Sequence, residues 1–395
     1  MEACKGFPIG LSMSASSEVA LPILLTALCM TAIGLLSVLL RRRTSLGAAS
    51  QPAPASRRRE LSCSGRWEKR EDDGLRLHPR TAFGSWGRGM GELMNPRFLL
   101  STAEGILVAD SGNNRLQIFS ADGEPLRIIS GGRPGHPTGL ASDGIHVWVA
   151  DSSNCSVTKV RLSSGSPELR CGSYGSAANE FSAPEGLALA HGVLFVADEG
   201  NQRVVLLDAA TLTWRGAFGS PGRQCGDLWN PVGLTVIDQE LYVRDTHNHR
   251  IHVFDVKGAV EGAVEGAVEG ARGPGACGAC LRSFGGAGSA PGLFDTPTGM
   301  VHDGHGRLLV SEAGAKRIQM LSTHGVPLQV LPLPHAGRLF GMCVRGGVIY
   351  VADYENHQLH VLDLKQAPLP LSPPVSPARP TVSPQSTVDA LYLTS

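Results

Sequence analysis

The feature that most constrains the fold of this chain is a phrase of 12 residues that it repeats six times. The first copy, from Val108 to Phe119, reads VADSGNNRLQIF. Less regular copies begin at Val149, Val196, Val243, Val310 and Val351. One unit of a repeat protein cannot bury its apolar surface alone, so such units stack around a shared core. Internal repetition therefore decides the architecture before any single motif is considered.

The spacing of the copies, and the strands between them, indicate which repeat architecture this is. The acidic residues of successive copies lie 41, 47, 47, 67 and 41 residues apart. In the third unit, apolar runs at 183–190, 193–197, 203–207 and 213–218 are separated by turns rich in Gly, Asn and Asp. Such runs are typical of strands, and no stretch shows helical periodicity. Four short strands per unit are the signature of a propeller blade, so the sequence predicts an all-β, six-bladed β-propeller over residues 75–364.

The position of the fourth strand predicts how the ring closes. A fourth-strand segment follows each of the first five units, whereas the sixth unit runs directly into a Pro-rich tail. A similar segment, Pro79–Phe83, stands before the first unit. We expect this N-terminal strand to complete the last blade, because the pairing removes two open sheet edges that would favour aggregation.

A long apolar segment precedes the repeats. Residues 19–40 carry no charge, and a helix of this length reaches roughly 33 Å, enough to cross the hydrocarbon core of a bilayer. Three arginines follow at once, beginning with Arg41. This flanking charge predicts that the short segment 1–18 lies outside and that the rest of the chain faces the cytosol. We therefore expect a single-pass membrane protein with a cytosolic propeller.

Three further segments lack the repeat pattern. Residues 41–74 form a basic linker rich in Ser and Pro, and an insertion at about 257–280 contains a tandem GAVE sequence. The tail at 365–395 is rich in Pro and Ser. The compositions of the insertion and the tail predict disordered chain, and that of the linker predicts a solvated tether.

The phrases that join the units resemble a known family. Phe83-Gly-Ser-Trp-Gly, followed by Gly91-Glu-Leu and Asn95-Pro, precedes the first copy, and Phe218-Gly-Ser with Asn230-Pro repeats the pattern. Together with the acidic turn phrase, this pattern resembles the NHL repeat. The resemblance implies a six-bladed propeller. It does not imply one function, because family members bind proteins, bind RNA or, in a related lyase, perform metal-assisted chemistry.

The repeated phrase itself predicts a structural role. Asp and Asn suit the turn between the second and third strands because their side chains bond the local backbone, and Gly suits it because Gly adopts positive φ. An acid stands third in all six copies, where the turn begins, and we expect the Arg of four copies to pair with these acids. Features shared by most blades are typical of a scaffold, since a ligand site usually breaks symmetry. The blade-turn residues are Asp110, Asn113, Arg115, Asp151, Asn154, Asp198, Asn201, Arg203, Asp245, Asn248, Arg250, Glu312, Arg317, Asp353 and Asn356.

The sequence predicts no catalytic set, no metal site and no cofactor. Its His residues gather in turn phrases, and there is no phosphate loop, Ser nucleophile motif or RING or B-box pattern. Glu185, on the first strand of the third unit, could face the propeller channel, but the equivalent positions hold no matching acid. Those positions are Thr138, Val232, Thr298 and Phe340.

The nine Cys residues are scattered and form no pairs at the repeat period. We therefore expect reduced thiols rather than disulfides, as in the cytosol. Cys277 and Cys280 form a CxxC pair inside the insertion, but one such pair without a His partner does not establish a zinc site.

The sequence favours a membrane-anchored propeller that acts as a scaffold for protein–protein interaction. The alternative is a metal-dependent lyase or lactonase-type enzyme with its site in the channel. RNA binding is less favoured, because residues 82–364 hold 21 basic against 27 acidic residues. The expected partners are proteins on the propeller loops and the membrane through residues 19–40. In the tail, Pro374, Pro377 and Arg379 have the form of an SH3-domain ligand, although a solvated tail has the same composition.

Overall fold

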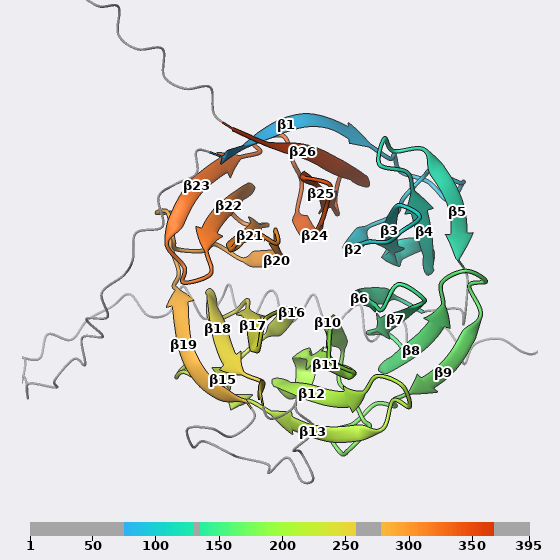
Figure 1. The fold of residues 1–395 in the computed structure, drawn as a ribbon, viewed down its shortest axis with the longest axis vertical. Coiled ribbons are helices and arrows are strands. Elements are labelled where there is room, and N and C mark those ends of the chain that lie inside the picture. Colours follow the sequence, from blue (N-terminus) through green and yellow to red (C-terminus); the bar gives the residue numbers. More distant parts are fainter. Residues whose placement is uncertain (1–74, 130–134, 258–277, 367–395) are drawn as a thin grey trace, which may run out of the picture. The chain divides into compact units, whose positions relative to one another are not determined.

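The computed structural model describes residues 75–129, 135–257 and 278–366. These residues form six four-stranded antiparallel sheets, arranged as blades around a central channel (Figure 1). The all-β, six-bladed propeller predicted from the repeats is therefore confirmed.

Each blade runs from a first strand at the channel to a fourth strand at the rim (Figure 1). Blades one to three consist of β2 (Pro96–Ser101), β3 (Ile106–Asp110), β4 (Arg115–Phe119), β5 (Pro125–Ile129); β6 (Pro137–Ser142), β7 (His146–Asp151), β8 (Ser156–Arg161), β9 (Pro167–Cys171); and β10 (Pro184–Ala190), β11 (Val193–Asp198), β12 (Arg203–Asp208), β13 (Trp214–Phe218). Blades four to six consist of β16 (Pro231–Ile237), β17 (Glu240–Asp245), β18 (Arg250–Asp255), β19 (Ala279–Gly285); β20 (Pro297–His302), β21 (Arg307–Glu312), β22 (Arg317–Ser322), β23 (Pro327–Pro332); and β24 (Leu339–Arg345), β25 (Val348–Asp353), β26 (Gln358–Gln366), β1 (Leu75–Phe83). The remaining elements are the short helices η1 (Ser111–Asn113) and η2 (Glu199–Asn201) and a parallel pair, β14 (Ser220–Pro221) and β15 (Asp227–Leu228).

The core of the propeller lies between the blades. The second strands β3 and β11 are buried along their whole length and read as continuous apolar runs, because both faces pack against neighbours. The apolar clusters cross blade boundaries, and one of them joins Phe119 of blade one to Tyr350 of blade six. A fourth strand such as β9 is largely exposed at the rim. Each blade is therefore stabilised by its neighbours.

The ring closes through the N-terminal strand, as predicted. Strand β1 pairs antiparallel with β26, in a register that runs from Leu75 opposite Gln366 to Phe83 opposite Leu359. Leu77 of β1 is buried in a cluster with residues of blades five and six. The two ends of the propeller are thus held in one sheet, and blade six has four strands like the other blades.

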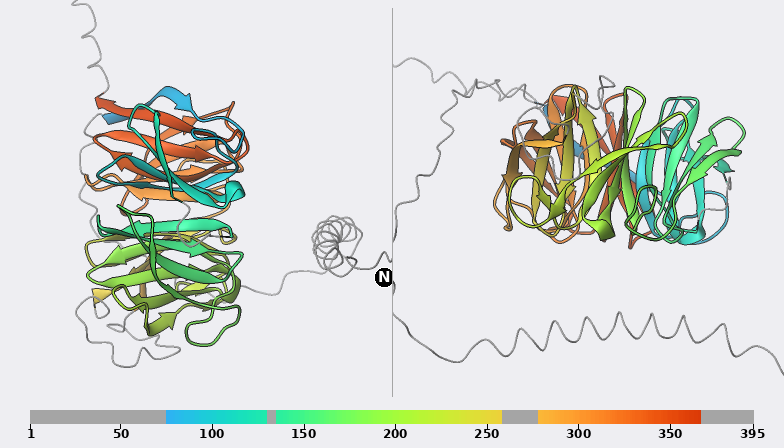
Figure 2. Two further views of the ribbon diagram at one scale, coloured as in Figure 1. Left: turned by 90° about the vertical axis from the view of Figure 1, so that its right-hand side faces the viewer. Right: turned by 90° about the horizontal axis from the view of Figure 1, so that it is seen from below.

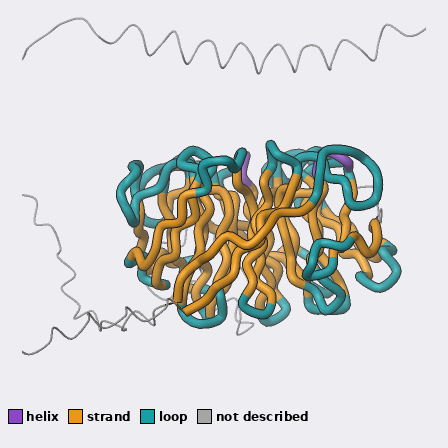
Figure 3. The backbone as a smooth tube through the Cα atoms, turned by 90° about the horizontal axis from the view of Figure 1, so that it is seen from above, coloured by secondary structure: helices purple, strands orange, loops and turns teal. Residues whose placement is uncertain are grey.

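The loops lie on two faces of the ring, visible edge-on in Figures 2 and 3. One face carries the turns between second and third strands together with the loops that lead from each blade into the next; we call it the motif face. In blade one, the N–H of Gly112 donates to the carbonyl oxygen of Met94 at 2.8 Å and joins the two kinds of loop. The turns between first and second strands and between third and fourth strands form the opposite face.

Several predicted segments lie outside the described residues. These are the N-terminal segment 1–18, the predicted membrane helix 19–40, the linker 41–74, most of the insertion (258–277) and the tail from residue 367 with its SH3-type residues. Among the residues that the structure does describe, no helix has the length and apolar character needed to span a bilayer. Strand β19 begins at Ala279, so the predicted insertion ends slightly earlier than expected.

The expectation of reduced thiols throughout is wrong for one pair. Cys225 and Cys280 are joined by a disulfide, although 55 residues separate them in the sequence. The loop that leads into blade four carries Cys225, and it folds back over the outer strand β19, which carries Cys280. Repeat spacing does not reveal this pair because no other blade has it. Cys155, Cys171 and Cys343 are free thiols.

Candidate functional site: the motif face and the channel mouth

The acid of the repeated phrase bonds the loop that leads into its own blade, which we call the blade-entry loop. In blade one, Asp110 is completely buried, and its carboxylate accepts the backbone N–H of Met94 at 2.7 Å. The same carboxylate accepts Nδ2 of Asn113 at 2.9 Å, and Asn113 also donates to the carbonyl oxygen of Gly87 at 2.8 Å. Asp198 and Asn201 make the equivalent bonds in blade three. In three other blades the Asn side chain also donates to the acid: Asn154 to Asp151, Asn248 to Asp245 and Asn356 to Asp353. In blade five, Glu312 accepts the backbone N–H of Asp295.

The Arg of the phrase adds an ion pair in three blades. Nε of Arg115 lies 2.7 Å from Asp110, Nε of Arg203 lies 2.9 Å from Asp198, and Arg317 pairs with Glu312 at 2.6 Å. The rest of each guanidinium donates to carbonyl oxygens of the blade-entry loop.

Blade four departs from this arrangement. Arg250 donates to the carbonyl oxygens of Asn248 and Arg223. The ring of His252 instead lies beside the turn acid, with Nε2 at 3.4 Å from Asp245. The expected pairing of Arg250 with its acid is therefore wrong, since its guanidinium bonds backbone carbonyl oxygens instead.

The turn glycine has a different role from the one expected. The residue with positive φ stands four places after the acid, and in no copy is it Gly: Asn114, Cys155, Gln202, His249, Lys316 and His357 have φ from 47° to 56°. At Gly112, a Cβ would lie 2.8 Å from the carbonyl oxygen of Met94. At Gly200, it would lie 2.6 Å from the carbonyl oxygen of Ser182. The glycine therefore allows close approach of the blade-entry loop.

The first strands approach one another closely where they begin, at the channel mouth on the motif face. A Cβ at Gly139 would lie 2.0 Å from the carbonyl oxygen of Glu185, and one at Gly186 would lie 2.1 Å from that of Val232. These glycines follow the position that faces the channel, so neighbouring blades place those side chains close together. Thr138 at this position donates to the carbonyl oxygen of Pro184 at 3.0 Å and links blade two to blade three.

An ion pair crosses the channel mouth. Nη1 of Arg97, from blade one, lies 2.8 Å from Oε1 of Glu185, from blade three. The Arg97 guanidinium also stacks over the ring of Phe340 from blade six, 5.1 Å from its centroid. Burial raises the pKa of Glu185 to about 7, and the Arg97 charge offsets this only in part. Side chains from three blades thus meet at this end of the channel.

A second guanidinium is buried beside this pair. Arg244 of β17 is 0% exposed, and within the described chain none of its three guanidinium nitrogens has a hydrogen-bond partner. Burial lowers the pKa of Arg244 to about 9, which leaves the group charged at neutral pH, and Glu185 and Glu199 are the acids that act on it. Glu199 also accepts Nδ2 of Asn230 at 2.5 Å. A buried cation without acceptors carries a desolvation cost that structural residues usually avoid.

Sequence reasoning identified Glu185 but missed Arg97 and Arg244. Arg97 occupies the position of Glu185 in blade one, so comparing all six first strands would have found it. Arg244 stands directly before the turn acid, where four other copies have Ala and one has Ser: Ala109, Ala150, Ala197, Ala352 and Ser311. This departure from the small residue of the other copies was the sequence signal that could have identified Arg244.

Beyond its mouth the channel has a mixed lining of apolar and polar groups. A cavity of about 330 Å³ is lined by the first strands of all six blades, including Leu100, Leu140, Leu189 and Val344. Ser101, Ser142, Thr235 and His302 supply the polar side chains of this lining.

Three exposed aromatic side chains lie on loops of the motif face. Trp86 is 67% exposed and Tyr174 is 78% exposed, each on the entry loop of its blade. Trp229, 44% exposed, precedes blade four and packs against the Arg223 guanidinium at 4.9 Å. The large apolar side chains exposed in the turns of the opposite face are Ile145 and Val326.

Comparison with known proteins agrees with this geometry. The family model described as NHL repeat matches residues 228–254 and 341–362, which cover blade four from its entry loop to β18 and most of blade six. The chain belongs to the NHL-repeat β-propeller family. None of the curated proteins compared with this NHL propeller is similar enough to count as a match.

Solved structures share the propeller fold at low sequence identity. A Bacteroides thetaiotaomicron protein of unknown function has a TM-score of 0.52 and 16% identity over 74% of this chain and 76% of that chain. A streptogramin B lyase has a TM-score of 0.50 and 13% identity over 74% of this chain and 98% of that chain. Virginiamycin B lyase from Staphylococcus aureus, in complex with quinupristin, has a TM-score of 0.49 and 14% identity over 74% and 100%. At these identities the first two likenesses concern the fold of the NHL propeller alone.

Proposed function

We propose that this NHL propeller is a protein-binding scaffold, anchored to a membrane through residues 19–40, and that its partner docks on the motif face. The observation that carries the proposal is the exposure of Trp86, Tyr174 and Trp229 on loops of this one face. Trp and Tyr are enriched among residues that dominate binding energy, since they bury a large area at a small cost in side-chain entropy.

The repeated turn phrase supports this role because it holds the aromatic loops in place. Arg203 binds carbonyl oxygens of Ser176, Ala177 and Glu180, which follow Tyr174 in the same loop. Arg115 does the same for the loop of Trp86 through the carbonyl oxygens of residues 88, 89 and 92. Loops fixed in advance lose little conformational freedom on binding, and this favours affinity.

The channel chemistry favours a scaffold over a metal-dependent lyase or lactonase. The channel mouth combines two guanidinium groups, Arg97 and Arg244, with the carboxylate of Glu185. Divalent cations require several oxygen or imidazole ligands, and neighbouring guanidinium charges repel them. Metal analysis of the purified protein discriminates between the two functions. One Ca²⁺ or Zn²⁺ per chain would favour the enzyme, provided that a variant without Cys225 and Cys280, whose sulfurs are the other possible metal ligands, still binds it.

Proximity labelling from the intact, anchored protein tests the proposal in cells. The double variant Trp86→Ala with Tyr174→Ala should lose specific labelled proteins that the unaltered chain retains. The matched control replaces Ile145 and Val326 of the opposite face with Ser and should keep the same labelled set. Equal labelling by both variants would contradict docking on the motif face, and labelling of only lumenal or extracellular proteins would contradict the cytosolic topology.

A further inference from the structure

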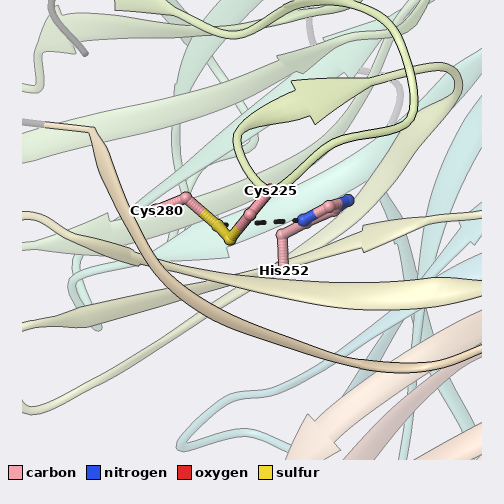
Figure 4. A group of neighbouring side chains, drawn as sticks. All are labelled: Cys225, His252 and Cys280. Atoms are coloured by element: carbon pink, nitrogen blue, oxygen red, sulfur yellow. Dashed lines mark hydrogen bonds between the residues drawn. A yellow bond between two sulfur atoms is a disulfide. The ribbon is translucent and has the colours of Figure 1, made fainter. Parts of the chain in front are cut away.

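The disulfide of blade four has an imidazole beside it. His252 of β18 is completely buried, and its Nδ1 lies 4.0 Å from Sγ of Cys280 (Figure 4). One ligand atom from each of Cys225, His252 and Cys280 lies within 4.8 Å of the other two. Three different segments of the chain supply these residues: the entry loop, the third strand and the fourth strand of one blade.

We infer that the reduced form of this cluster is a zinc site, with Cys225, Cys280 and His252 as its protein ligands. Two thiolates and one imidazole form a donor set that zinc prefers, and three protein ligands leave the fourth tetrahedral position to water. The inference is independent of the proposed docking on the motif face.

The geometry of the backbone suits a metal as well as a disulfide. Zn–S and Zn–N bonds of about 2.3 and 2.0 Å at tetrahedral angles place the ligand atoms roughly 3.5–3.8 Å apart. The Cα atoms of Cys225 and Cys280 are 5.8 Å apart. Rotation of the two Cys side chains about the bonds to Cβ is therefore enough to separate the sulfurs. Cys225 is exposed, which gives the ion a path to the site.

Asp245 supplies the outer support that a metal-binding imidazole needs. Its Oδ2 lies 3.4 Å from Nε2 of His252, on the side of the ring opposite the sulfurs. A carboxylate in this place keeps the proton on Nε2 and leaves the lone pair of Nδ1 free for the metal. In blade six, His360 makes the same contact with Asp353 at 2.8 Å. The sulfur pair is what distinguishes blade four.

Conversion between the two forms is a balanced redox step. One dithiol, or two molecules of glutathione, gives two electrons and two protons to the Cys225–Cys280 disulfide and is itself oxidised to a disulfide. The S–S bond breaks and two thiols form. Binding of Zn²⁺ then releases both thiol protons, because the thiolate is the ligand. The disulfide form and the zinc form both hold the entry loop of blade four against β19.

Cobalt substitution in the purified full-length protein tests the inference. After reduction and anaerobic removal of the reductant, Co²⁺ should give thiolate-to-cobalt charge-transfer absorption and the visible bands of a tetrahedral site. These bands should saturate at one equivalent and disappear when Zn²⁺ is added. Cys225→Ser should weaken cobalt binding by at least about tenfold, since even outer-shell changes cost that much. His252→Asn should weaken it similarly.

Cys171→Ser is the matched control, because Cys171 is a free thiol on the rim strand of another blade. It should leave the cobalt spectrum unchanged. Absence of charge-transfer bands in the reduced protein, with its melting transition intact, would overturn the inference and leave the pair as a simple disulfide. Unchanged bands in the Cys225→Ser protein would overturn it as well.

Discussion

Replacement of Arg115 by Ala measures how much the turn phrase contributes to stability. Nε of Arg115 lies 2.7 Å from the carboxylate of Asp110, which is completely buried. Removing one partner of a buried ion pair costs about 3–5 kcal/mol, because a charge is left uncompensated. Asp110 keeps the N–H of Met94 and the side chains of Asn113 and Gln117 as donors. We therefore expect the lower end of this range, about 3 kcal/mol of unfolding free energy.

Arg250→Ala is the matched variant because Arg250 occupies the same position without the ion pair. Its guanidinium donates to two backbone carbonyl groups, so its loss should cost about 1 kcal/mol. For a domain of this size, 1 kcal/mol lowers Tm by about 2 °C. Thermal unfolding followed by Trp fluorescence should show a drop of about 6 °C for Arg115→Ala and about 2 °C for Arg250→Ala. Equal drops would refute the ion-pair reasoning, and an unchanged Tm with loss of partner binding would make Arg115 a binding residue.

Three further predictions concern the closure and the channel mouth. Deletion of residues 75–83 should abolish the cooperative melting transition, because blade six loses its outer strand; an unchanged Tm would contradict the closure. Ionisation of Glu185 costs more in the folded state, where burial raises its pKa from the ordinary value of 4.5 to about 7. Wild-type unfolding free energy should therefore fall by about 3 kcal/mol as pH rises from 4.5 to 8, and urea unfolding of Glu185→Gln should lack this fall. Arg244→Met should raise Tm, since an apolar side chain of similar length replaces a buried cation without acceptors; a lower Tm would show that Arg244 has structural partners.

The sequence predicted the fold closely because propeller strands are local and periodic. The predicted runs 193–197 and 203–207 lie within β11 and β12, and the segment Pro79–Phe83 lies within β1, which closes the ring. Because the pattern occurs six times, an irregular copy can be recognised by comparison with the other five. A feature that occurs in only one blade has no second copy and is missed by this comparison.

The candidate site was accordingly the part that the sequence revealed least. Glu185 was identified, but its partner Arg97 stands two blades away and only the ring brings them to 2.8 Å. The Cys225–Cys280 pair was missed for the same reason, since its spacing has no counterpart in other blades. Even the turn glycine was misassigned, because its contact with the blade-entry loop is tertiary and its φ is not the reason for its presence.

The departures from the repeat are concentrated in blade four. Arg244 replaces a small residue before the turn acid, Arg250 bonds backbone carbonyl oxygens and not its acid, and a disulfide ties the entry loop to the outer strand. The insertion also falls between β18 and β19 of this blade. Arg244 and the disulfide have no counterpart in the other described blades, and Arg244 carries a desolvation cost. A stable scaffold needs none of these changes, so blade four is where this propeller is specialised. Variants of its cluster and of Arg244 should therefore separate function from folding more cleanly than variants of the shared turn phrase.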